Sequence, residues 1–125
     1  MNWEQALELI LANINEGDLL PPNTAYGRQI INTPPFRCGN YNYENSPGYK
    51  VRIGNNTFIQ IPLSMLQKVF TNAIENYDGI YKNQVFGDHY SRQLNNHGCH
   101  VHVVGKIFLL SHVADKVNNR RYRIL

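Results

Sequence analysis

Apolar residues recur at helical spacing over residues 2–15, which predicts an amphipathic helix. Asn2 is a favourable N-cap, and Gln5, three positions later, can complete a capping box. Gly17 marks the expected end of the helix. The residues expected to face the core are Trp3, Leu7, Ile10, Leu11 and Ile14.

Residues 17–49 lack a regular period and predict a long Pro- and Asn-rich loop with one short strand between residues 25 and 32. The aromatic residues in this segment need cover, so we expect the loop to pack on the domain. Residues 49–61 then alternate between apolar and polar positions around Gly54-Asn55-Asn56, which predicts a β-hairpin.

The period returns to that of a helix after Pro62, a residue that suits a first helical turn. Apolar residues then form one stripe, from which we predict a helix over residues 62–76. The elements expected afterwards are a short strand at 80–81, a brief helix capped by Asn83, a polar loop at 91–98, a third helix at about 99–112 and a hairpin at about 114–125.

These elements predict an α+β fold class. An N-terminal helix and a β-hairpin region precede a half that ends in a second hairpin. A chain of 125 residues is long enough to bury a core without disulfides. We divide it into residues 1–61, an extension that includes the Pro/Asn-rich loop, and residues 62–125.

The order of elements in residues 62–125, about half of the chain, resembles the winged helix-turn-helix superfamily. The stretches that carry the resemblance are 101–108, 113–117 and 121–124, read as a recognition helix followed by two strands of a wing. The resemblance implies a winged-helix-like C-terminal half. It also implies a non-catalytic protein that binds double-stranded DNA, in a family whose members often act as homodimers. The helix at 2–15 is a candidate dimer contact.

Under this resemblance the third helix enters the major groove, and the wing, residues 114–125, approaches the backbone. The helix face opposite Val103 and Ile107 is expected to present DNA contacts, and Arg121 and Arg123 are expected to share one strand face, opposite Tyr122. The basic residues expected to bind phosphates are Lys106, Arg120 and Arg121. The complete candidate set is His100, His102, Lys106, Asn118, Asn119, Arg120, Arg121 and Arg123.

The distribution of charge agrees with a polyanionic partner. Residues 1–20 hold four acidic residues and no Lys or Arg. Residues 21–125 hold all 12 basic residues and the other five acidic ones, so the net charge of +3 divides into −4 and +7. The basic residues are densest near the C-terminus, which is typical of a surface that meets a polyanion at one end of a molecule.

A cluster of histidines and a cysteine offers a metal site as an alternative. If residues 100–104 form a strand, His100 and His102 share a face and can bind one ion. If they form a helix, the two side chains diverge by about 200° and the pair is lost. The candidate ligands are His97, Cys99, His100 and His102, but the zinc-finger spacings are absent, so we expect no cofactor.

Motifs of common enzymes are absent: the chain contains neither a Gly-rich phosphate loop nor a G-x-S-x-G elbow. We therefore expect no enzyme. The alternative to DNA binding is an interaction module that binds a protein or a small molecule on the same fold. With two cysteines, no apolar run of membrane-spanning length and no signal-peptide pattern, we expect a cytoplasmic protein without a membrane partner.

Overall fold

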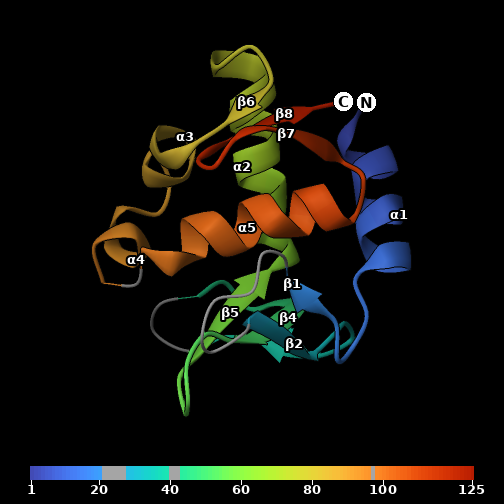
Figure 1. Cartoon of the computed structure of the whole chain (residues 1–125), viewed down its shortest axis with the longest axis vertical. Coiled ribbons are helices and arrows are strands. Elements are labelled where there is room, and N and C mark those ends of the chain that lie inside the picture. The colour runs from blue at the N-terminus through green and yellow to red at the C-terminus, as the bar shows by residue number, and fades with distance from the viewer. Residues whose placement is uncertain (21–27, 40–42, 97) are drawn as a thin grey trace.

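The structure, a computed structural model, describes residues 1–20, 28–39, 43–96 and 98–125. It combines helices with two antiparallel sheets, which confirms the α+β class (Figure 1). The helices are α1 (Trp3–Asn13), α2 (Leu63–Asn76), α3 (Asn83–Gly87), α4 (Ser91–Asn96) and α5 (Cys99–Leu110). The strands are β1 (Leu19–Leu20), β2 (Arg28–Asn32), β3 (Arg37–Cys38), β4 (Ser46–Arg52), β5 (Phe58–Pro62), β6 (Ile80–Tyr81), β7 (Ala114–Asn118) and β8 (Arg121–Ile124).

Helix α1 begins with the predicted capping box. The Asn2 side chain accepts from the Gln5 backbone N–H, and the Gln5 side chain accepts from the Asn2 N–H, each at 2.9 Å. Its buried face differs from the predicted one, because Ala6 faces the core while Leu11 is 46% exposed. The reason is that α1 packs with Trp3 against Phe70 of α2, at 5.6 Å between ring centroids, and this orientation turns Leu11 to solvent.

The predicted hairpin over residues 49–61 is present as β4 and β5, with Val51 opposite Ile59. Strand β4 also pairs with β2 and β3, and β1 pairs with β2, so one sheet gathers all five N-terminal strands. Gly48 allows this crowding, since a Cβ at that position would lie 2.7 Å from both the Cys38 Sγ and the Pro62 Cα.

Strand β5 leads into α2 without a loop, because Pro62 ends the strand and is also the N-cap of the helix. The predicted helix is present, but Ile74, one of the apolar residues of the predicted stripe, is 41% exposed. Asn72 is buried in its place, and its Nδ2 donates to the Val85 carbonyl at 3.1 Å and to Asp88 at 3.0 Å. These bonds tie α2 to the α3 region.

The second sheet has the order β6-β8-β7, so the two-residue strand β6 lies beside the last strand of the chain. The strand at 80–81, the brief helix at α3 and the terminal hairpin are present as predicted. Two details of the prediction are wrong. Residues 91–96 form helix α4 within the segment expected to be a loop, and α3 is capped at Lys82, with no side-chain hydrogen bond from Asn83.

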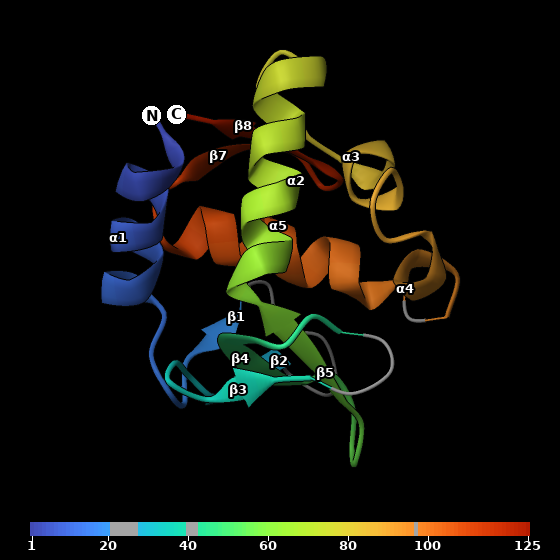
Figure 2. The ribbon, with the colours of Figure 1, turned by 180° about the vertical axis from the view of Figure 1, so that it is seen from behind.

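Helix α5 crosses α2 at the centre of the molecule, with β7 and β8 along one flank and β1 along the other (Figures 1 and 2). Tyr81 donates from its hydroxyl to the Val101 carbonyl at 2.9 Å, and its ring meets Phe108 edge-on at 5.6 Å. Residues on both sides of position 61 contribute to one hydrophobic core, from Ala6 to Tyr122. In the described ranges, no helix has the length and apolar character needed to cross a lipid bilayer.

Candidate functional site

Helix α5 presents one narrow stripe to solvent, while most of its surface is buried. Seven of its residues belong to the core, including Val103, Ile107 and Phe108. Cys99, His102, Lys106, Leu109 and Leu110 are half-buried. His102 and Lys106 are the polar, partly exposed side chains of this stripe, so they are the groups of α5 that a macromolecule could contact. Figure 1 shows α5 running across the side of the molecule that faces the viewer.

His100 does not lie on this stripe, and its predicted exposed position is wrong. Its side chain is fully buried, its Nε2 lies 2.9 Å from the Tyr43 hydroxyl, and its ring stacks on Phe86 with centroids 6.0 Å apart. Residues two apart on a helix point about 200° away from each other, so exposure of His102 places His100 in the core. His100 is therefore a core histidine.

The same helical geometry removes the basis for the metal hypothesis. Residues 100–104 are helical, so His100 and His102 do not share a face. Across the residues that the structure describes, no group of three or more His, Cys, Asp or Glu side chains could hold a metal ion. Of the two remaining candidate ligands, Cys99 belongs to no such group, and His97 lies outside the described residues.

The terminal hairpin divides its basic residues between two faces. The Tyr122 side chain packs against Gly105 of α5, and Lys116 is its cross-strand partner, so both lie on the α5 side of the sheet. Arg121 and Arg123 are exposed and alternate with Tyr122, so the strand period places them on the opposite face of β8, where Arg121 also lines a second hollow together with Arg120 and Gln84. They share a face with each other, but not with the exposed stripe of α5.

The turn of this hairpin is built by its own polar residues. The Asn118 Oδ1 accepts from the Arg120 backbone N–H at 2.9 Å, which is an Asx-type contact that shapes the turn. Asn119 and Arg120 are exposed in that turn. Arg120 is the residue of the β7–β8 turn that this arrangement brings toward His102.

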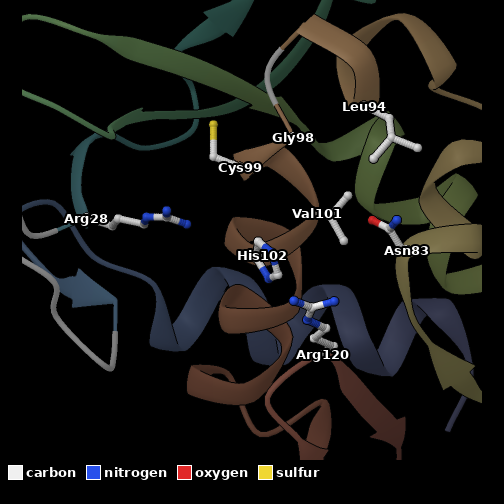
Figure 3. Close-up of a pocket in the computed structure, with 8 residues that line it drawn as sticks. All are labelled: Arg28, Asn83, Leu94, Gly98, Cys99, Val101, His102 and Arg120. Carbon is white, nitrogen blue, oxygen red and sulfur yellow. The ribbon is translucent and has the colours of Figure 1, made fainter.

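An open hollow of about 520 Å³ lies beside the first turns of α5. Figure 3 shows Arg28 entering from one side and Arg120 from another, with His102 between them. The lining residues are Arg28, Asn83, Gly98, Cys99, His102 and Arg120, with Leu94 and Val101 as apolar wall.

The charges around this hollow are mutually repulsive. Burial and then the positive charges of Arg28, Lys106 and Arg120 lower the pKa of His102 below its ordinary value of 6.5. Burial and then the charges of Arg28 and Lys116 lower the pKa of Lys106. The charged groups that shift these two pKa values are all cations, so the face is electropositive and favours an anionic partner.

Arg28 and Lys116 are members of this face that the sequence did not single out. The Arg28 Nη1 is buried and has no hydrogen-bond partner among the described residues. A signal for Arg28 existed in the sequence, because strand period 2 puts it on the same face as Ile30, a core residue. An arginine that faces inward from a strand needs an acidic or hydrogen-bonding partner, and the sequence pattern identifies no such residue for Arg28.

Neither cysteine has the lowered pKa of a catalytic thiolate. Burial raises the pKa of the Cys38 thiol to about 11 and also raises the pKa of Cys99. A catalytic thiolate requires the opposite shift. Cys38 is 1% exposed, whereas Cys99 is half-buried at the rim of the hollow.

Comparisons of the chain with models of known protein families, with curated protein sequences and with solved structures found no match. Function is therefore inferred from the geometry of the described residues.

Proposed function

We propose that this protein binds double-stranded DNA without catalysis, through the face formed by the exposed stripe of α5 and the α5 side of the β7–β8 hairpin. The observation that carries the proposal is the gathering of His102, Lys106, Lys116 and Arg120 on one side of the molecule, where Arg28 adds a fifth basic side chain. Phosphate contacts from Lys and Arg supply most of the affinity of proteins for DNA.

The arrangement of elements supports the same proposal. Over residues 63–124 the chain follows the order helix, short strand, helices, long helix and hairpin, with β6 beside β8. This order carries the resemblance to winged helix-turn-helix domains. In that superfamily the long helix meets the major groove and the hairpin meets the backbone.

The DNA contacts proposed from the sequence change in this light. Lys106, Arg120 and His102 remain proposed DNA contacts, and Lys116 and Arg28 are added to them. Arg121 and Arg123 are proposed to contribute less to DNA binding, because they project from the other face of the hairpin. Asn118 and Asn119 remain candidates for backbone contacts at the turn.

The proposal includes two finer points. A homodimer could form through α1, whose outward face exposes Leu11, and sedimentation velocity over a range of concentrations tests for it. The proposal keeps the expected cytoplasmic location, which is the compartment that holds DNA in a cell without a nucleus.

The alternative function is a protein- or small-molecule-binding module. The position of Arg121 and Arg123 favours it, because a dedicated DNA surface would gather all the wing arginines on the helix side. The two functions differ in their salt dependence, since DNA binding releases counterions in proportion to the phosphates contacted.

Fluorescence anisotropy with a random-sequence duplex at two salt concentrations tests the proposal. We expect saturable binding at low salt that weakens steeply as salt is raised. Absence of binding at low salt, by a protein whose circular dichroism shows it to be folded, would contradict the proposal and favour the interaction module.

A further inference from the structure

We propose that the hollow beside the first turns of α5 is a binding site for a single phosphate group, held between Arg28, His102 and Arg120. The site goes beyond general electrostatic attraction to DNA, because it fixes one anion at one place. When the phosphate belongs to a DNA backbone, the inference rests on the proposed function. When the bound group is a free phosphate, the inference does not depend on the proposed function.

The first support is the state of Arg28. Its guanidinium comes from β2 toward α5 (Figure 3), and its Nη1 is shielded from solvent without a hydrogen-bond partner among the described residues. A buried, unpaired donor on a charged group costs free energy. Because Nη1 is covered, an anion in the open hollow recovers this cost only when the guanidinium turns toward it. A guanidinium offers two parallel N–H donors, a geometry that matches phosphate oxygens.

The second support is convergence from separate elements. Arg28 belongs to β2, His102 to α5, and Arg120 to the turn between β7 and β8. The α5 backbone at Gly98 lines the same hollow, where the positive end of a helix dipole adds to the attraction. Asn83 contributes a polar side chain to the wall, so an anion there would meet donors from several sides.

The third support is the choice between anions. The two arginines supply more positive charge than a single carboxylate balances, and a neutral His102 adds a hydrogen-bonding ring nitrogen. A free or monoester phosphate carries up to two negative charges, and a backbone phosphodiester carries one, but each offers several acceptor oxygens. A hollow of about 520 Å³ that is open to solvent admits a phosphate that remains attached to a larger molecule. The geometry thus fits both a free and an esterified phosphate.

Cys99 provides a built-in reporter for the test. It lines the hollow, while the other cysteine, Cys38, is 1% exposed. Alkylation of the folded protein by iodoacetamide, a neutral reagent, should therefore proceed at Cys99, which peptide mass spectrometry verifies. An anion in the hollow slows the reaction by covering the thiol and by raising its pKa further.

The experiment titrates inorganic phosphate at constant ionic strength and measures the alkylation rate of Cys99. We expect saturable protection that chloride alone does not give. Arg28→Gln should weaken the phosphate affinity about tenfold or more, as expected for loss of a charged hydrogen bond. Arg52→Gln, which replaces an exposed arginine of β4 that does not line the hollow, serves as the matched control and should leave protection unchanged.

Arg120→Gln tests the site independently of Arg28→Gln, whose substitution lies in strand β2 and can affect folding. Arg120 is exposed in a turn, so its replacement leaves the core intact, and we expect several-fold weaker protection by phosphate. Lack of saturable protection in the wild-type protein, or equal protection in the wild type and Arg120→Gln, would overturn the phosphate site.

A second arm with a random-sequence duplex separates the two proposals. Protection of Cys99 by phosphate without any duplex binding would support the site and refute the DNA function. If anisotropy shows duplex binding but neither phosphate nor duplex protects Cys99, the DNA function is supported and the phosphate site is refuted. Protection by both, weakened by Arg28→Gln, supports the backbone phosphate as the occupant.

Discussion

The ring of Tyr122 occupies the space that a side chain at position 105 would need. Gly105 lies in the middle of α5, and a Cβ built there would stand 2.8 Å from the Tyr122 Cδ2. The absence of a side chain at this one position lets the last strand of the chain lie close against the central helix. A residue that weakens an isolated helix therefore strengthens the packing of the domain.

Replacement of Gly105 by Ala should destabilise the protein. Ala improves helix propensity by about 1 kcal/mol, but overpacking against a buried ring costs about 1–3 kcal/mol, so we expect a net loss of up to about 2 kcal/mol. Urea denaturation followed by circular dichroism measures the change. Gly39→Ala is the control, because among the described residues no atom beyond its chain neighbours lies within 4 Å of the added Cβ. A more stable Gly105→Ala protein would show that Tyr122 can move aside.

Arg120 and Arg123 should differ in their effect on DNA binding. Arg120 lies on the α5 side at the hollow, and Arg123 projects from the opposite face of the hairpin. Arg120→Ala should weaken duplex binding and reduce the slope of log affinity against log salt by about 1, as for loss of one phosphate contact. Arg123→Ala should change both much less. Anisotropy at several salt concentrations provides the test, and equal effects of the two variants would mean that DNA does not approach the α5 side.

His102 should make the stability of the protein depend on pH near its ordinary pKa. Its folded-state pKa is lowered by burial and by Arg28, Lys106 and Arg120, so the unfolded chain takes up a proton first as pH falls through 6.5. Stability is then lost below that pH. His102→Gln has no such proton, so it should lose less stability than the wild type between about pH 8 and pH 5.5. Paired urea titrations at the two pH values decide the point.

Glu44 should act as a charged anchor for the contact between α2 and the α3–α4 segment. Its Oε1 accepts from the Tyr90 hydroxyl at 2.6 Å and from the Ser64 Oγ at 3.0 Å, with the Lys68 Nζ at 3.5 Å. Burial raises the pKa of Glu44, but the hydrogen bonds and the Lys68 charge outweigh it, so the net pKa is lowered. The stabilisation is therefore present above the ordinary value of 4.5 and is lost as pH falls below it.

Glu44→Gln should lower the free energy of unfolding by about 1 kcal/mol at neutral pH, a modest figure because the site is partly solvated. The deficit should shrink toward about pH 3, where the wild-type carboxylate is also protonated. Glu8→Gln, on the exposed side of α1, should show neither effect. A deficit that persists unchanged in acid would assign the loss to shape and not to charge.

The sequence predicted correctly those elements that depend on residues close together in the chain. The capping box at Asn2, the hairpin turn at residues 54–56 and the strand alternation around Tyr122 all depend on neighbouring residues, and all three are present. Helix α4 escaped prediction because it has six residues and one apolar side chain, Leu94, so its stability comes from packing against α3 and α5.

The site was predicted less well than the fold, because its membership depends on contacts between distant residues. Arg28 reaches α5 only after β2 has paired with β4, a pairing that no local pattern reveals. His100 was predicted to lie on the exposed face of the helix together with His102. Residues two apart on a helix point in nearly opposite directions, so only one of the two can be exposed there. Val101, Val103 and Val104 are β-branched but helical, because α5 is buried around most of its circumference and this burial overrides their strand propensity.

The reach of Arg28 and Arg120 across α5 has a consequence for the dynamics of the fold. Arg28 comes from the N-terminal sheet and Arg120 from the C-terminal hairpin, so an anion gripped by both would act as a noncovalent cross-link between the two ends of the chain. Such a link opposes local opening of either sheet. Amide hydrogen exchange in both sheets should then slow together when the anion is present, including at strands that never touch it.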